Sequence, residues 1–118
     1  FRRVLFRSNY TEAIKRFQEV QGDSRRRGVV ALELGECFQK IKQYQLAMQN
    51  YATAVEVLTD RELETRKRAL YRAGVLAAGL EDVDAAKKYL SMLAGIDFGY
   101  RDVAQRLDKL ASGKDNGA

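Results

Sequence analysis

The chain lacks histidine and has a single cysteine, and these scarcities exclude several kinds of chemistry. None of its 118 residues is His and one is Cys, at position 37. Catalysis by a Ser–His or Cys–His pair is therefore excluded, and we expect no metal site because Cys37 stands alone. One cysteine also cannot form an internal disulfide. For Cys37 we weigh a small buried apolar residue against a reactive thiol, and favour the buried residue.

Other sequence signatures are also missing. No apolar stretch is long enough to span a bilayer, and no glycine-rich run has the spacing of a phosphate loop. The carboxylate pairs Glu62/Glu64 and Asp82/Asp84 lie at predicted helix starts, where interaction with the helix dipole explains them without acid–base chemistry. We therefore expect no catalytic residues, no cofactor and no enzymatic activity. We expect a cytoplasmic location unless a targeting or membrane segment precedes the sequence.

The first eight residues, FRRVLFRS, resemble one reading frame of a widely used sequencing-library adapter. We therefore expect residues 1–8 not to belong to the protein, and the gene to continue upstream of Asn9. The alternative is a natural basic start to the first helix. The formal net charge is +5. Without Arg2, Arg3 and Arg7 it falls to +2, so the apparent basicity is weak evidence for binding of nucleic acid.

The stretch 34–54 is typical of two helices that pack closely across a short turn. Small residues and aromatic rings recur in it at helical spacing. Two helices approach closely only where side chains are small, and the rings then fill the space around the contact. The residues of this pattern are Leu34, Gly35 and Phe38 in the first helix, and Ala47, Tyr51 and Ala54 in the second.

The same pattern recurs on both sides of this stretch. Ala13 and Phe17 precede Ala47 and Tyr51 by 34 residues. Downstream, the echoes of Gly35, Ala47 and Tyr51 follow at a separation of 39, and they are Gly74, Ala86 and Leu90. A helix–turn–helix unit of 34 residues with small and aromatic residues at these offsets resembles the tetratricopeptide repeat family.

The family pattern is W-x2-L-G-x2-Y, then A-x3-F, then P. Here it reads Ala31-x2-Leu34-Gly35-x2-Phe38, then Ala47-x3-Tyr51, with Thr59 where the proline falls. The chain contains no Trp and no Pro, and its second spacing carries five extra residues. The resemblance covers about residues 9–98. It implies an all-α fold of antiparallel helix pairs, about two and a half repeats plus a C-terminal capping helix.

We expect a helical repeat domain over residues 9–111 and a flexible tail over residues 112–118. Asp23 or Ser24 is expected to cap the second helix, Thr59 and Glu62 to form a capping box, and Gly95 to end the fifth helix. The last helix would cover the apolar face of the final pair. The expected helices are 9–20, 25–40, 44–58, 60–78, 84–93 and 100–110.

In tetratricopeptide proteins the first helices of successive pairs line a concave groove that takes peptides. The resemblance thus implies a partner-binding surface, which we term the predicted groove. Arg68 and Arg72 share one helical face and are expected to bind a carboxylate or an acidic peptide. The alternative is a solvated face on which they pair with Glu64. The predicted groove consists of Leu32, Glu36, Gln39, Arg68, Tyr71, Arg72 and Val75, with Val29 and Glu33 alongside.

Three functions remain open. The first is a scaffold that binds another protein, as a piece of a larger one. The second is a nucleic-acid-binding array centred on Arg25–Arg27 and Arg66–Arg68, although no aromatic residue is interleaved with the basic ones. The third is the regulatory tail of an enzyme whose catalytic domain lies upstream. We favour the scaffold. The lysine and asparagine that the family's chaperone-binding members use are replaced by Leu32, Glu33 and Glu36, which argues against that specificity.

Overall fold

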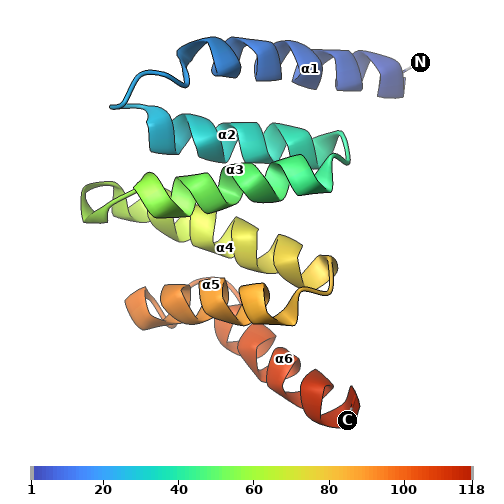
Figure 1. Cartoon of the computed structure of the whole chain (residues 1–118). Helices are drawn as coiled ribbons and strands as arrows, with labels where there is room; N and C mark the ends of the chain where they lie inside the picture. The colour runs from blue at the N-terminus through green and yellow to red at the C-terminus, as the bar shows by residue number, and fades with distance from the viewer. Residues whose placement is uncertain (1, 118) are drawn as a thin grey trace. The chain divides into compact units, whose positions relative to one another are not determined.

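The chain folds into α-helices, as its apolar periodicity predicts. The computed structural model describes the backbone of residues 2–117 and the side chains of residues 9–113. Over residues 2–117 it contains no β-strand, so the all-α prediction is confirmed. In chain order the elements are α1 (Arg2–Val20), α2 (Arg27–Lys40), α3 (Tyr44–Val57), the 3-10 turn η1 (Asp60–Glu62), α4 (Leu63–Gly79), α5 (Val83–Ile96) and α6 (Val103–Gly117) (Figure 1).

The helices pack as two compact units, residues 1–69 and residues 70–118. The first unit contains α1, α2, α3 and the start of α4. Within it, α2 and α3 lie side by side as an antiparallel hairpin, and α1 packs against α2 (Figure 1). The second unit contains the rest of α4 with α5 and α6, and α5 packs against α6. This packing of neighbouring helices is consistent with a helical repeat.

Both helix hairpins close with the same turn. After α2, Lys42 adopts a left-handed conformation with φ 65°, and the Gln43 amide donates to the Phe38 carbonyl oxygen at 2.9 Å. After α4, Glu81 has φ 63°, and the Asp82 amide donates to the Ala77 carbonyl oxygen at 2.9 Å. This hydrogen-bond pattern is a Schellman motif, which satisfies the last carbonyl groups of a helix. Glu81 follows Lys42 by 39 residues, the separation at which the small residues repeat.

Both hairpins also have close contacts at glycines, at Gly28 and Gly35 in the first and at Gly74 in the second. A Cβ atom on Gly35 would lie 2.5 Å from ring carbons of Tyr51 and 3.2 Å from the carbonyl oxygen of Ala47. A Cβ atom on Gly74 would lie 2.6 Å from the Leu90 side chain. The distances of 2.5 Å at Gly35 and 2.6 Å at Gly74 are shorter than any tolerable van der Waals contact. Glycine at these positions therefore allows each helix pair to approach closely.

The core is apolar throughout the part of the chain with described side chains, where no buried residue is polar or charged. In the first unit Tyr51 is its largest fully buried side chain, and Phe38 lies at its margin with 9% of its surface exposed. Ala13 and Phe17 on α1 are only half-buried. In the second unit the fully buried residues are Leu70, Ala73, Ala86, Leu90, Leu93 and Val103.

The first helix boundary that differs from the prediction is the start of α2. The residue before α2 is Arg26, and no side chain caps the helix there. Asp23 was expected as the cap, but its carboxylate accepts a hydrogen bond from the Arg25 amide at 3.0 Å. Its carbonyl oxygen accepts another from the Arg26 amide at 3.0 Å. The Asp23 side chain therefore closes a separate turn ahead of the helix, and neither Asp23 nor Ser24 is the cap.

Thr59 caps the 3-10 turn η1, but its hydrogen bonds are not those of the predicted capping box with Glu62. Its hydroxyl accepts a hydrogen bond from the Arg61 amide at 3.3 Å. Its carbonyl oxygen accepts one from the Glu62 amide at 2.9 Å, which closes a 3-10 turn. The α-helix α4 therefore begins at Leu63 rather than at residue 60.

The C-terminal boundaries also differ from the prediction. Gly95 does not end α5, which continues to Ile96, because its backbone does not adopt the left-handed conformation of a glycine that ends a helix. α6 begins at Val103 rather than residue 100, because the backbone before it turns through Arg101, which has φ 42°. α6 then runs to Gly117, through most of the segment that was expected to be a flexible tail.

Two N-terminal expectations relate partly to residues that the structure does not describe. α1 starts at Arg2 rather than residue 9. The backbone of residues 2–8 is thus helical, while Phe1 and the side chains of residues 1–8 lie outside the described part. The origin of this segment stays a prediction.

Among the helices that are described, none combines the length and the apolar character needed to cross a membrane.

Candidate interaction surface

The α2 part of the predicted groove is a narrow exposed stripe. α2 is buried on most of its circumference, since its residues 30–32, 34–35 and 37–38 are all buried. Val29 has 39% of its surface exposed, and Glu33 and Glu36 are half-buried. Leu32, expected to line the groove, has no exposed surface. It belongs to the core because α2 packs against neighbours on more than one side, so in this structure it offers no surface to a partner.

Arg68 on α4 is already paired with a carboxylate of α2. Its Nε lies 2.9 Å from Oε2 of Glu36 and its Nη2 lies 2.6 Å from Oε1. This two-point geometry is the most favourable one for an arginine–carboxylate pair. Glu33 adds a second carboxylate at 4.0 Å from Nη1. The side chain of Arg68 is 46% exposed and that of Glu36 is 13% exposed. Arg68 is therefore neutralised within the first unit.

Glu64, which the alternative prediction paired with Arg68 and Arg72, forms an ion pair with Lys67. The Nζ atom of Lys67 lies 3.2 Å from Oε2 of Glu64, one helical turn away. Of the cluster Arg66–Arg68, two members thus form ion pairs. This weakens the hypothesis of a nucleic-acid site centred there, because paired charges release fewer counterions. In the other cluster, Arg25 lies 3.8 Å from the Asp23 carboxylate and is 90% exposed.

Gln39, a member of the predicted groove, is hydrogen-bonded to a core residue. Its side-chain oxygen accepts a hydrogen bond of 2.6 Å from the Tyr51 hydroxyl. Tyr51 has no exposed surface, and a buried hydroxyl without a partner would destabilise the fold. Gln39 therefore fixes the ring that packs on Gly35.

In the second unit, Tyr71 is occupied by contacts with α6 and the turn before it. Its hydroxyl donates to Oδ1 of Asp102 at 2.7 Å. The Arg106 Nε donates to the same oxygen at 3.0 Å. The guanidinium carbons of Arg101 and Arg106 lie 5.4 Å and 5.7 Å from the centre of the Tyr71 ring, within reach of a cation–π interaction. The Tyr100 ring lies 5.7 Å away.

These contacts make Asp102 a stable anion. The hydrogen bond from Tyr71 holds the pKa of the Asp102 carboxyl below its usual range, and Arg106 adds to the effect. Because the pKa is lowered in the folded state, the contact stabilises α6 above the ordinary pKa of an aspartate and weakens as the pH falls below it. Tyr71 was predicted to contact a partner. Here its polar end is used to position α6.

The remaining α4 members of the predicted groove are on the surface. Arg72 is exposed and Val75 is half-buried. Both belong to the second unit, whereas Glu36, Gln39 and Arg68 belong to the first.

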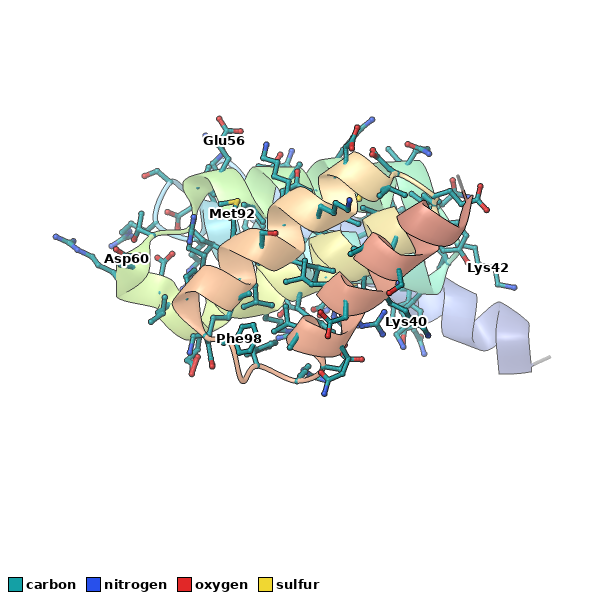
Figure 2. All side chains as sticks on the ribbon, turned by 90° about the horizontal axis from the view of Figure 1, so that it is seen from below. Lys40, Lys42, Glu56, Asp60, Met92 and Phe98 are labelled. Carbon is teal, nitrogen blue, oxygen red and sulfur yellow. The ribbon has the colours of Figure 1, made fainter. Side chains whose placement is uncertain are left out.

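The largest exposed apolar side chain of the second unit is Phe98, with 68% of its surface exposed, in the turn between α5 and α6 (Figure 2).

Cys37 is buried, as expected for a small apolar residue. Only 8% of its surface is exposed. Burial raises the pKa of its thiol, and the charges of Glu33 and Glu36 raise it further. A raised pKa keeps the thiol protonated and unreactive. Among the residues that the structure describes, no three His, Cys, Asp or Glu side chains are grouped so that they would hold a metal ion.

A comparison with protein-family models found no match, and a comparison with curated proteins found none. The tetratricopeptide resemblance therefore stays a prediction. What the structure adds is local: the same turn and the same glycine contact occur in both hairpins.

Sequence reasoning missed the Tyr71 cluster. Asp102 and Arg106 are four residues apart, so their pairing on one helix was predictable from spacing. Tyr71, however, is 31 residues from Asp102, and no local pattern relates two residues at that distance. Sequence reasoning also missed the pairing of Glu36 with Arg68, which are 32 residues apart.

Proposed function

We propose that this chain is a non-catalytic helical-repeat scaffold, of the tetratricopeptide type, that binds a segment of another protein. The observation that carries the proposal is the repetition of one hairpin design. Gly35 against Tyr51 and Gly74 against Leu90 make equivalent close contacts, and Lys42 and Glu81 close equivalent turns. Repeated helix pairs with an apolar core present polar outer surfaces, and such arrays commonly bind other proteins through them.

The binding surface that we propose lies in the first unit and includes the exposed stripe of α2 and Arg68 at the start of α4. Glu36 competes for Arg68 with any acidic ligand, because it already occupies the guanidinium at two points. A partner's carboxylate must therefore displace Glu36 from Arg68. The affinity for an acidic segment is then limited by an internal competitor, which a single substitution removes.

Changing Arg68 and Arg72 together to alanine should weaken the capture of acidic peptides by the full chain. We expect a loss of about 30-fold, equivalent to ~2 kcal/mol, since arginines are among the residues that dominate protein interfaces. Glu36→Gln should have the opposite effect and tighten binding, because it frees Arg68 while keeping the side-chain volume. Fluorescence anisotropy of labelled acidic peptides measures both effects.

The matched control is the double change Arg25→Ala, Arg26→Ala, which removes the same charge from another part of the surface. It should reduce the affinity by much less. Equal losses in the two double variants would mean that the peptides respond to overall charge, and the proposed surface would be wrong. Unchanged affinity in Glu36→Gln would contradict the competition between Glu36 and the ligand.

A further inference from the structure

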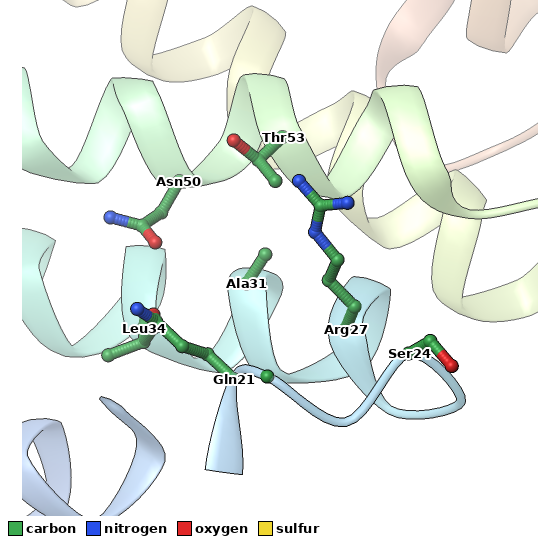
Figure 3. Close-up of a pocket in the computed structure, with 8 residues that line it drawn as sticks. Gln21, Ser24, Arg27, Ala31, Leu34, Asn50 and Thr53 are labelled. Carbon is green, nitrogen blue, oxygen red and sulfur yellow. The ribbon is translucent and has the colours of Figure 1, made fainter. Parts of the chain in front are cut away.

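A cavity of about 550 Å³ lies in the first unit between α2, α3 and the loop that joins α1 to α2 (Figure 3). Its floor is formed by Ala31 and Leu34 of α2, which have only 5% and 2% of their surface exposed. Its walls are polar. Cavities of this volume hold small organic ligands, which typically need an apolar base and a few well-placed polar groups.

Arg27 provides the positive charge of this cavity. Its side chain extends from the first turn of α2 toward Thr53 on α3 (Figure 3). Lys67 and Arg68 form ion pairs. By contrast, within the set of described side chains, Arg27 has no carboxylate within 4.0 Å and no hydrogen bond. Residues 21–27 contain three arginines and one aspartate, so the local charge favours an anion.

The α3 wall of the cavity presents a hydrogen-bond acceptor at Asn50. The Asn50 Nδ2 donates to the Leu46 carbonyl oxygen at 2.9 Å, which leaves Oδ1 on the cavity side (Figure 3). The Thr53 hydroxyl donates to the Gln49 carbonyl oxygen of its own helix at 3.1 Å, and the Thr53 methyl group lies on the cavity side (Figure 3). Gln21 on the loop supplies a further amide. The Asn50 oxygen repels the oxygens of a phosphate group and attracts an N–H donor.

We propose that this cavity binds a small organic carboxylate that carries an amide N–H next to its acid group, the chemistry of an N-acylated amino acid. Arg27 pairs with the carboxylate. The Asn50 Oδ1 accepts a hydrogen bond from the amide, and a small apolar side chain lies on Ala31 and Leu34. This site is separate from the surface proposed for protein binding and does not depend on it.

Titration of the ¹⁵N-labelled full chain with N-acetyl-L-alanine tests the proposal by NMR. The amide signals of Ala31, Asn50 and Thr53 should shift in a saturable way. Arg27→Gln should weaken the binding about tenfold or more, because a hydrogen bond to a charged group contributes that much. Arg25→Gln is the matched control. It removes the same charge from an exposed side chain outside the cavity, and it should change the affinity less than about twofold.

Two further probes separate the ligand class from general anion binding. The neutral N-acetyl-L-alaninamide should bind much more weakly than the acid, since it cannot pair with Arg27. Inorganic phosphate should shift the same signals less, because it offers no N–H donor. Equal shifts with phosphate, equal losses in Arg27→Gln and Arg25→Gln, or no saturable shift at Asn50 and Thr53 would each overturn the proposal. Arg27 is exposed, so a thermal melt of its variant should match the unsubstituted chain.

Discussion

Gly35→Leu should destabilise the first unit by about 3 kcal/mol, near the upper end for overpacked cores. A Cβ at this position would lie 2.5 Å from the Tyr51 ring, and the larger leucine side chain extends further. Tyr51 cannot move aside, because it has no exposed surface and its hydroxyl is held by Gln39. The Ala47 backbone closes the other side. Thermal or urea unfolding, followed by circular dichroism, measures the loss.

The control for this prediction is Gly95→Ala. Gly95 lies within α5, and nothing stands within 4 Å of the place of its missing Cβ. Alanine should therefore stabilise this helix by roughly 0.5–1 kcal/mol, because glycine loses more backbone entropy on folding. A Gly35→Leu variant that unfolds like the unsubstituted chain would show that α2 and α3 do not pack through Gly35.

Val103→Asp should release α6 from the second unit. Val103 has no exposed surface, so the new carboxylate would be buried without a partner, at a cost of about 3 kcal/mol or more. Release of α6 would expose apolar residues such as Leu90 and Leu93, and exposed apolar patches promote association. Size-exclusion chromatography and thermal unfolding should show both a lower melting temperature and larger species.

Gln105→Asp is the matched control for Val103→Asp. It adds the same charge to α6 two residues later, at an exposed position. Its melting temperature should stay close to that of the unsubstituted chain, since a carboxylate near a helix N-terminus interacts favourably with the dipole. Similar losses in the two variants would mean that α6 responds to charge rather than to the burial of Val103.

The hairpins were predictable because their information is local. Gly35, Ala47 and Tyr51 repeat at helical spacing, and the 39-residue separation to Gly74 and Leu90 is read directly from the sequence. The close contacts follow from residue size alone. The presence of each helix was therefore predictable, whereas several helix ends differ from their predicted positions. At the start of α2, the Asp23 side chain bonds to a nearby amide instead of capping the helix.

The candidate surface was less predictable because its pairings are distant in sequence. The family resemblance placed Leu32 in the predicted groove, but α2 is buried on several sides, and the pattern of one helix does not reveal how many neighbours it has. Arg68 was expected to await a ligand, yet Glu36 lies within hydrogen-bonding distance. Only the packing of α2 beside the start of α4 brings these two charges together.

The central claim is that this scaffold binds a partner segment on the exposed stripe of α2 and on α4. Amide hydrogen exchange tests this claim most directly. It would be measured on the full chain with and without the tightest peptide from a random acidic library. The claim predicts slower exchange in residues 29–39 and 63–69 when the peptide is bound. Protection confined to α1 or α6, or a library that yields no binding peptide, would contradict it.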